Sequence, residues 1–379
     1  MERQPLKLLY GFKVWRIGLV FFLSLLLLFI LFAGSQAPSN IQNRGDSEPV
    51  EININRDPVA SNKTAGSPGP GWDGRLVIDP VVIKDGSLYK MWYTGEGLDW
   101  KWRIGYATSP DGISWTKYDG NPVLDVGLEG TWDSDVARVS VVLKSEGIYH
   151  MWYNGNGHSR FGYATSPDGI NWTKYVDNPV FDLGLPGSWD ENWVSLAGII
   201  REAGLYKLWY TGQDSSGTGR IGFATSPDGI NWTRHPSNPV LDIDPASNWD
   251  GSWVFDPYVI YDGGSYHMWY SGWTGAACDP NAFMRIGLAS SPDGVTWIRS
   301  INNPVLDVSP GEWDYHGVTA PWVIFDGSVY QMWYHGGGWC EGVEMIGYAT
   351  SPDGVAWTKY EGGPVLGVTR LVYLPAIIK

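Results

Sequence analysis

Residues 72–95 read WDGRLVIDPVVIKDGSLYKMWYTG, and residues 103–125 read RIGYATSPDGISWTKYDGNPVLD. Four further copies of this unit follow in the 379-residue chain, each opened by a Trp-Asp pair. The opening tryptophans are 60, 57, 60 and 64 residues apart, at Trp72, Trp132, Trp189, Trp249 and Trp313. A fixed period of this kind is the signature of a repeat architecture, in which each copy forms one supersecondary unit.

Each copy predicts four short antiparallel strands. In the first copy we expect them at Pro80–Lys84, Tyr89–Thr94, Arg103–Thr108 and Ser114–Tyr118. The Asp-Gly and Ser-Pro-Asp-Gly sequences between them are turn signals. Aromatic residues alternate with small or polar ones, as half-buried strands require. Repeated four-stranded units of this type are propeller blades, so we predict an all-β fold, a five-bladed β-propeller of four-stranded antiparallel blades.

The predicted propeller covers residues 71–370, with blades at about 71–130, 131–187, 188–247, 248–311 and 312–370. Residues 1–33 combine a basic start with an apolar run, which predicts a hydrophobic helix before the propeller. This helix is either a cleaved signal peptide or an uncleaved membrane anchor, and both place the rest of the chain outside the cell or on its surface. Residues 34–70 form a flexible linker rich in Ser, Asn, Gly and Pro. The apolar tail at 371–379 has no assigned role.

The amino-acid composition limits the classes of ligand that the chain is expected to bind. The formal charge of −14 argues against nucleic acid, because phosphate binding requires a basic face. An acidic chain with 23 tryptophans favours a neutral oligo- or polysaccharide, bound by a monomer. Cys278 and Cys340 lie in corresponding loops of consecutive blades, and in an exported chain this predicts a disulfide. We predict no metal site and no cofactor, although a structural calcium ion in the channel is left open.

Residues repeated in all five copies are expected to serve the fold. The five Trp-Asp aspartates are interpreted as structural clamps, with Arg103, Arg160, Arg220 and Arg285 as candidate partners. The aspartates of the Ser-Pro-Asp-Gly turns are expected to accept hydrogen bonds from the turn backbone. The loops that vary in length all lie on the opposite face from these turns, and variable loops carry specificity. We therefore expect the functional site on the variable-loop face.

Function is expected where the repeat loses its symmetry. At the seventh residue after each opening tryptophan, the copies carry Asp79, Val139, Leu196, Asp256 and Ala320. Carboxylates thus open the first strand only in the first and fourth blades. Two carboxylates around a sugar-sized cavity are what glycoside hydrolysis needs, one as acid and one as base or nucleophile. The alternative is that both are Asp-Pro strand starts without chemistry.

Other singular residues lie in the same loops. Glu191 is a second candidate proton donor, beside Asp256. Arg138 is a candidate substrate clamp and His335 a further candidate for substrate binding. Candidate sugar-stacking surfaces are Trp100, Trp193, Trp253, Trp273 and Trp339. Some of these tryptophans are alternatively expected to pack between blades. Further singular polar residues are Asp135, His158, His316, Glu341 and Glu344.

From Trp72 to about Arg370, the chain resembles the five-bladed propeller superfamily of arabinanases, β-xylosidases, levansucrases and invertases. The resemblance rests on the five blades, on the Asp79-Pro80-Val-Val-Ile segment and on blade phrases such as Gly105–Trp115. It implies that Asp79 is the base or nucleophile. A second-blade aspartate and a third-blade glutamate normally complete the set. In their places stand Arg138-Val139-Ser140 and Ser195-Leu196-Ala197.

These observations leave three hypotheses. The first is an exported or membrane-tethered glycoside hydrolase with Asp79 as base or nucleophile and Asp256 or Glu191 as acid. The second is a carbohydrate-binding propeller without catalysis, which the missing second- and third-blade carboxylates favour. The third is a protein-interaction scaffold, a common use of propellers. The sugar, its linkage and the stereochemical outcome stay open, because the distance between the carboxylates decides the last of these.

Overall fold

The computed structural model describes residues 71–275, 282–338 and 344–368. The predicted N-terminal helix, the linker and the apolar tail lie outside these ranges, as do Cys278, Trp339, Cys340 and Glu341. Within the described ranges, no helix is long and apolar enough to span a bilayer.

Twenty strands and one short helical turn make up the described part of the chain. Blade 1 contains β1 (Leu76–Asp85), β2 (Leu88–Glu96), β3 (Trp102–Ser109) and β4 (Thr116–Lys117). Blade 2 contains β5 (Arg138–Ser145), β6 (Ile148–Asn154), the 3₁₀ turn η1 (Asn156–His158), β7 (Phe161–Ser166) and β8 (Thr173–Lys174). Blade 3 contains β9 (Trp193–Glu202), β10 (Leu205–Gln213), β11 (Gly219–Ser226) and β12 (Thr233–Arg234). Blade 4 contains β13 (Trp253–Tyr261), β14 (Tyr266–Trp273), β15 (Arg285–Ser291) and β16 (Ile298–Arg299). Blade 5 contains β17 (Val318–Phe325), β18 (Tyr330–Gly337), β19 (Glu344–Ser351) and β20 (Thr358–Lys359).

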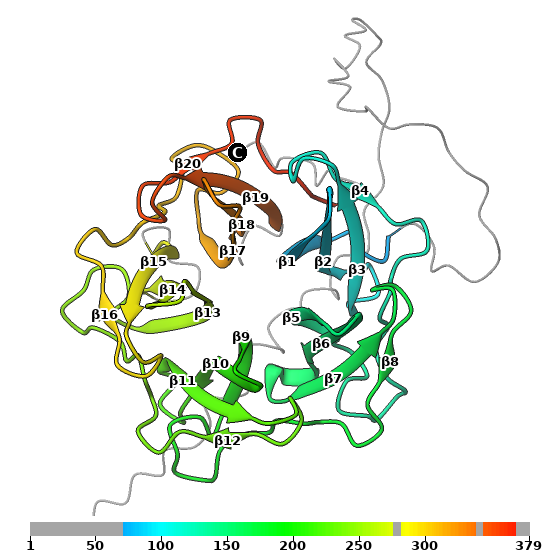
Figure 1. Cartoon of the computed structure of the whole chain (residues 1–379), viewed down its shortest axis with the longest axis horizontal. Helices are drawn as coiled ribbons and strands as arrows, with labels where there is room; N and C mark the ends of the chain where they lie inside the picture. The colour runs from blue at the N-terminus through cyan, green and yellow to red at the C-terminus, as the bar shows by residue number, and fades with distance from the viewer. Residues whose placement is uncertain (1–70, 276–281, 339–343, 369–379) are drawn as a thin grey trace, which may run out of the picture. The chain divides into compact units, whose positions relative to one another are not determined.

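The strands of each blade pair in chain order and antiparallel, as the sequence predicts. Figure 1 shows the five sheets around a central axis, with β1, β5, β9, β13 and β17 innermost. Single parallel bridges connect some neighbouring blades, and the bridge from Gly219 to Trp253 joins blades 3 and 4 into one continuous sheet. The described part of the chain is therefore all-β, with its four-stranded sheets arranged as in a β-propeller.

Five buried tryptophans close the ring. One stands in the second strand of each blade, and each is at most 1% exposed. Its indole N–H donates to the glycine carbonyl of the Ser-Pro-Asp-Gly turn of the next blade, at 2.7–3.0 Å. The pairs are Trp92 with Gly169, Trp152 with Gly229, Trp209 with Gly294, Trp269 with Gly354, and Trp333 with Gly112. The fifth bond returns from blade 5 to blade 1, so the circuit is complete.

The Trp-Asp aspartates are structural clamps, as predicted. Asp73, for example, is 0% exposed and accepts hydrogen bonds from Tyr93 (3.2 Å) and Lys117 (2.7 Å) of its own blade. The same cation-aspartate pair recurs as Lys174–Asp133, Arg234–Asp190, Arg299–Asp250 and Lys359–Asp314. The cation comes from the short outer strand in every blade, because this strand runs alongside the end of the sheet that holds the aspartate.

The arginines expected to pair with these aspartates have other partners, so that prediction was wrong. Arg103, Arg160, Arg220 and Arg285 pair instead with Asp125, Asp182, Asp242 and Asp307. The reason is that the Pro-Val-Leu-Asp segment after the outer strand (Pro-Val-Phe-Asp in blade 2) bridges back to the third strand in blades 1–4, as between Ile104 and Leu124. The turn aspartates do accept backbone hydrogen bonds: Asp111 binds the N–H groups of Ile113 and Ser114 at 2.9 and 2.7 Å.

The first strand of each blade is bulged at the position where the sequence loses its symmetry. In blades 1, 4 and 5 the register shifts across an X-Pro pair, between Ile78 and Val81 in blade 1. The residue before the proline is left-handed in each: Asp79 has φ 54°, Asp256 φ 49° and Ala320 φ 47°. A non-glycine residue in this region costs about 1–2 kcal/mol. Bulges re-aim side chains, and two of these three positions carry a carboxylate.

The indole circuit gives a first testable expectation. We expect Trp333→Phe to lower the free energy of unfolding by about 1–3 kcal/mol, because it removes a buried hydrogen-bond donor and part of a ring. The carbonyl of Gly112 keeps its second donor, the Trp115 indole at 3.0 Å, which limits the loss. Urea denaturation would measure the change. Trp100→Phe is the control, since Trp100 is 67% exposed, and an equal loss in both variants would contradict the role given to the circuit.

Candidate functional site

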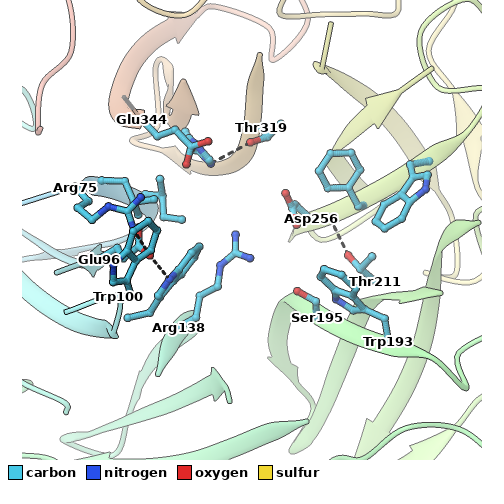
Figure 2. A pocket seen from close by; sticks show the side chains of 16 residues that line it. Arg75, Glu96, Trp100, Arg138, Trp193, Ser195, Thr211, Asp256, Thr319 and Glu344 are labelled. Atoms are coloured by element: carbon cyan, nitrogen blue, oxygen red, sulfur yellow. Dashed lines mark hydrogen bonds and ion pairs between the residues drawn. The ribbon is translucent and has the colours of Figure 1, made fainter. Parts of the chain in front are cut away.

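All five blades contribute side chains to one cavity of about 440 Å³ near the central axis. Its charged or titratable lining residues are Arg75, Glu96, Arg138, Asp256, His335 and Glu344. Its aromatic lining residues are Trp100, Trp102, Trp193, Trp253 and Phe255, and the rest are Leu76, Ile78, Ser195, Thr211 and Thr319. A cavity of this volume has the size of a small-molecule site. Figure 2 shows Asp256 on one side of it, facing Arg138, Glu96 and Glu344 on the other.

Asp79 and Arg138 form a bidentate ion pair between blades 1 and 2. Arg138 Nε lies 2.5 Å from Asp79 Oδ2, and Arg138 Nη2 lies 2.7 Å from Asp79 Oδ1. The two side chains are only 3% and 11% exposed. The fork geometry of a guanidinium matches both carboxylate oxygens, which makes this the strongest type of ion pair. Both oxygens of Asp79 are therefore occupied by Arg138, whose guanidinium lines the cavity.

Asp256 forms no comparable ion pair with any cation of the described residues. Burial raises the pKa of its carboxyl group to about 7, and the nearby charge of Asp79 adds to this while Arg138 opposes it. The amide N–H of Asp256 donates to Thr211 Oγ1 at 2.9 Å, and Ser271 Oγ–H donates to Asp256 Oδ2 at 3.5 Å. A carboxyl group with a pKa near 7 still carries its proton in a large fraction of molecules at neutral pH. It can therefore serve as a general acid.

A histidine-glutamate pair from blade 5 lines another part of the cavity. His335 Nε2 lies 3.4 Å from Glu344 Oε2, and its Nδ1 lies 3.3 Å from the hydroxyl of Thr319. His335 is 5% exposed and Glu344 also 5%. Burial lowers the pKa of His335, but the charge and hydrogen bond of Glu344, together with the charge of Asp79, outweigh burial and raise the pKa above its usual value. The pair therefore favours an imidazolium facing the cavity.

Blade 1 supplies one buried carboxylate, Glu96, together with an arginine and two tryptophans at the cavity wall. Glu96 Oε1 lies 2.9 Å from Arg75 Nη1 and accepts a hydrogen bond from the Trp102 indole at 3.0 Å. Burial raises the pKa of Glu96. The guanidinium of Arg75 lies 3.2 Å from the ring centroid of Trp100, a close cation–π stack. Trp100 has φ 63° and is 67% exposed, so it presents an aromatic surface at the cavity mouth.

Aromatic side chains of blades 3 and 4 form the opposite wall. The rings of Trp193 and Trp253 meet edge to face, with centroids 6.1 Å apart and planes at 89°. Phe255 continues this wall at 6.0 Å from Trp253. Apolar ring faces suit the C–H faces of a sugar, while the charged wall suits its hydroxyl groups. Most charged groups of the cavity thus come from blades 1, 2 and 5, while the wall of blades 3 and 4 is mainly aromatic apart from Asp256.

A second, smaller cavity of about 30 Å³ brings Asp79 and Asp256 together. Both carboxylate-bearing residues line it, with Ser140 and the prolines that follow the bulges, Pro80, Pro257 and Pro321. Asp256 also lines the large cavity, whereas Asp79 does not. The count from the opening tryptophans therefore predicted two residues that meet near the axis. Of the two, only Asp256 faces the space where a sugar fits.

The structure places most of the predicted binding residues at this site. Arg138, Trp100, Trp193, Trp253 and His335 all line the large cavity. Trp273 does not line it; its strand pairs it with Trp253 at the far end of β14, which corrects its assignment. Trp339, also predicted to bind substrate, and the predicted Cys278–Cys340 disulfide lie outside the described residues.

Glu191 is a further correction. It does not line the cavity; its Oε2 accepts a hydrogen bond from the amide N–H of Gly187 at 2.6 Å. This bond lowers the pKa of Glu191, with a further contribution from Ser215. A proton donor at neutral pH needs the opposite shift. Glu191 therefore serves a loop, and Asp256 is left as the candidate acid.

Sequence reasoning missed Glu96 as a site residue and gave Glu344 no role. Both are buried where a second or third strand borders the axis, Glu96 at the end of β2 and Glu344 at the start of β19. A signal existed for Glu96: the corresponding position of the other blades carries no carboxylate, as in Gln213 of blade 3. In the described ranges, no group of three or more His, Cys, Asp or Glu side chains is arranged to hold a metal ion.

Comparison with known proteins finds distant sequence relatives and similar folds. No family model matches the chain. The uncharacterized protein Rv1502 of Mycobacterium tuberculosis is 26% identical over 272 residues, covering 67% of this chain and 86% of that protein. The 1,2-beta-oligomannan phosphorylase of Thermoanaerobacter sp. is 28% identical over 221 residues, covering 53% of this chain and 64% of that enzyme.

Solved structures show the same fold. A thermostable family-43 glycoside hydrolase superposes with a TM-score of 0.58 at 22% identity, covering 82% of this chain and all of that one. A structure from work on the GH130 family of mannoside phosphorylases, which contains hydrolases of β-1,2 mannosidic linkages, gives 0.59 at 18% identity, covering 76% and 88%. The chain therefore shares the fold of the glycoside-hydrolase-like five-bladed propellers, which confirms the resemblance inferred from the sequence.

Proposed function

We propose that the protein cleaves glycosidic bonds of an oligosaccharide bound in the large cavity, with Asp256 as the proton donor. The observation that carries this proposal is the buried carboxyl group of Asp256, with a pKa of about 7, on the wall of a sugar-sized cavity. The departing sugar oxygen needs a proton as the bond breaks, and positioned acids with a pKa near the working pH supply it best.

The other charged residues receive roles from their contacts. Asp79 holds Arg138 by two hydrogen bonds, so Asp79 acts as the positioning group and Arg138 as the group that meets the substrate. This differs from the base or nucleophile role that the resemblance implies for Asp79. Hydrolysis with inversion also needs a base on the opposite side of the bond. Glu96, whose pKa is raised, and Glu344 lie across the cavity from Asp256 and are the candidates (Figure 2).

A second candidate reaction is phosphorolysis, in which phosphate replaces water as the nucleophile. Two observations favour it: one relative is named as a β-1,2-oligomannan phosphorylase, and the cavity presents two cationic groups, Arg138 and His335. Guanidinium and imidazolium groups both bind phosphate oxygens. Non-catalytic carbohydrate binding is the remaining alternative.

The proposed function also includes a location and an oligomeric state. We propose that the N-terminal apolar segment directs export of the chain, either anchored to a membrane or released, and that the protein acts as a monomer.

One experiment separates these reactions. The full chain is incubated with β-1,2-linked mannooligosaccharides and with arabino- and xylooligosaccharides, with and without phosphate. We expect cleavage of at least one substrate; free sugar indicates hydrolysis, and sugar 1-phosphate formed only with phosphate indicates phosphorolysis. Glu191→Gln is the matched control, because it removes a carboxylate outside the cavity and should keep full activity. Binding without cleavage of any substrate would contradict the proposal and favour a binding propeller.

A further inference from the structure

One polar position recurs in the second strand of every blade, directly after the buried Trp-Tyr pair. The five residues are Thr94, Asn154, Thr211, Ser271 and His335, and all are at most 5% exposed. In three of them the hydroxyl oxygen accepts the backbone N–H of the bulged residue in the next blade. These bonds join Thr94 to Val139 (3.1 Å), Thr211 to Asp256 (2.9 Å) and Ser271 to Ala320 (3.0 Å). The position is therefore a blade-to-blade tie.

Ser271 makes a second contact in addition to its tie to blade 5. Its oxygen accepts the N–H of Ala320 from blade 5, so its own hydrogen is left to donate elsewhere. The acceptor is Asp256 Oδ2, 3.5 Å away in the neighbouring strand of blade 4. Ser271 thus connects the carboxyl group of Asp256 with the backbone of the next blade. The Ala320 N–H that Ser271 accepts belongs to the bulged residue of blade 5, which has φ 47°.

We propose that Ser271 is a positioning residue for Asp256, holding the carboxyl group toward the cavity and setting its proton affinity. The inference rests on the proposed function, since it gives Ser271 a purpose only if Asp256 transfers a proton. Thr211 contributes from the other side by fixing the main chain of Asp256. The main chain of Asp256 is then tied to blade 3, and its carboxyl group is linked through Ser271 to the backbone of blade 5.

The direction of the effect follows from the hydrogen bond. A hydroxyl that donates to a carboxylate stabilises the charged form and so lowers the pKa of the acid. Loss of the hydroxyl should raise the pKa of Asp256 above its value in the native protein. We expect an upward shift of about half a unit to one unit, because the bond is long. A serine that only tied the blades together would leave the titration of Asp256 unchanged.

The test measures the protonation of Asp256 without using activity. The carboxyl infrared band of Asp256 is isolated as the difference between the native protein and Asp256→Asn, and it is followed from about pH 4 to about pH 10. The measurement is repeated in a Ser271→Ala background, where we expect the midpoint to move upward. Ser271→Thr should restore the native midpoint, because threonine occupies the same position in blades 1 and 3. Thr94→Val is the matched control, since it breaks an equivalent tie to Val139, which has no carboxyl group.

The outcomes separate the inference from the function on which it rests. An upward midpoint in Ser271→Ala, with a native midpoint in Ser271→Thr and Thr94→Val, supports the inference, and the alkaline limb of kcat/KM should move by the same amount. An unchanged midpoint in Ser271→Ala overturns the inference even if the protein is an active glycosidase. A shifted midpoint in a protein that cleaves no substrate would leave the contact intact and reject only the proposed function.

Discussion

Asp256→Asn is expected to abolish most activity while making the folded protein more stable above neutral pH. The amide keeps the shape of the carboxyl group but cannot transfer a proton, so kcat should fall about 10²–10⁴-fold. The same change removes a carboxyl group that must ionise in a buried place. Active sites often contain groups that lower the stability of the folded protein, so a gain in stability when such a group is replaced is typical of a catalytic residue.

The pH dependence of this gain follows from the two pKa values. The pKa of Asp256 is about 7 in the folded protein and 3.8 in the reference state, so the folded form binds the proton more tightly. The stability that protonation contributes is fully present below about pH 4 and is lost as pH rises through about 7. Asp256→Asn should therefore exceed the native protein by about 2–4 kcal/mol at about pH 8, and the difference should vanish near pH 4.

Urea denaturation at several pH values would measure the stability, and the oligosaccharide assay would measure the loss of activity. Glu191→Gln again provides the control, because its exposed carboxyl group has a lowered pKa. If Asp256→Asn were less stable than the native protein at alkaline pH, the burial assigned to this carboxyl group would be wrong. If it kept full activity, Asp256 could not be the proton donor.

Arg138→Met is expected to cause the largest loss of stability among the variants considered. It leaves the Asp79 carboxylate, 3% exposed, without the guanidinium that satisfies both of its oxygens. Breaking a buried ion pair from one side costs about 3–5 kcal/mol. Activity should also fall, because Arg138 lines the cavity. Denaturation by urea, with m-values compared to confirm a similar folded state, would give the number.

The double variant Asp79→Asn with Arg138→Met should be compared with the single variant Arg138→Met. Removing both charges should restore most of the stability, since no ion is then buried alone. Activity should stay low, because the guanidinium is still missing. Arg103→Met is the control for a surface-facing ion pair, as its partners Asp99 and Asp125 are 51% and 61% exposed. A single-variant cost as small as that of Arg103→Met would show that the Asp79–Arg138 pair is not buried in solution.

The repeat made the fold predictable, because turns, buried aromatics and strand spacing recur five times. Counting from the opening tryptophans also located Asp79 and Asp256, since the segment from each opening tryptophan to the aligned position has the same length in every copy. The Pro that follows each of them carried further information: Ala320-Pro321 completes a third bulge of the same kind. The proline after the aligned position was visible in the sequence of blades 1, 4 and 5. It indicates the shape of the backbone there and gives no information on the reaction.

The role of each charged group was harder to predict, because it depends on which partner lies within reach. Asp79 looked like a base until Arg138 was seen to occupy both of its oxygens. Glu191 looked like an acid because it follows a Trp-Asp pair, yet its loop turns it back onto Gly187. Glu96 is the one carboxylate at its position in the five copies, but the strand around it resembles that of the other blades, so this single departure gave no indication of a role. These contacts join residues far apart in the chain, and a sequence without an alignment does not report them.

Within the part of the chain that the structure describes, the circuit of blades closes without exchange of a strand. Among the described strands, blade 1 holds β1–β4 and blade 5 holds β17–β20, and no sheet mixes the two groups. The junction between them relies on side chains, such as Trp333 on Gly112, Trp322 on Val82 (2.6 Å) and Tyr89 on Gln331 (3.1 Å). The large cavity lies across this junction, with Glu96 on one side and Glu344 on the other. A ligand that contacts both residues would stabilise this junction, because binding to the closed ring favours the closed ring over the opened one. Occupancy of the cavity is therefore expected to strengthen the ring at the place where its first and last blades meet.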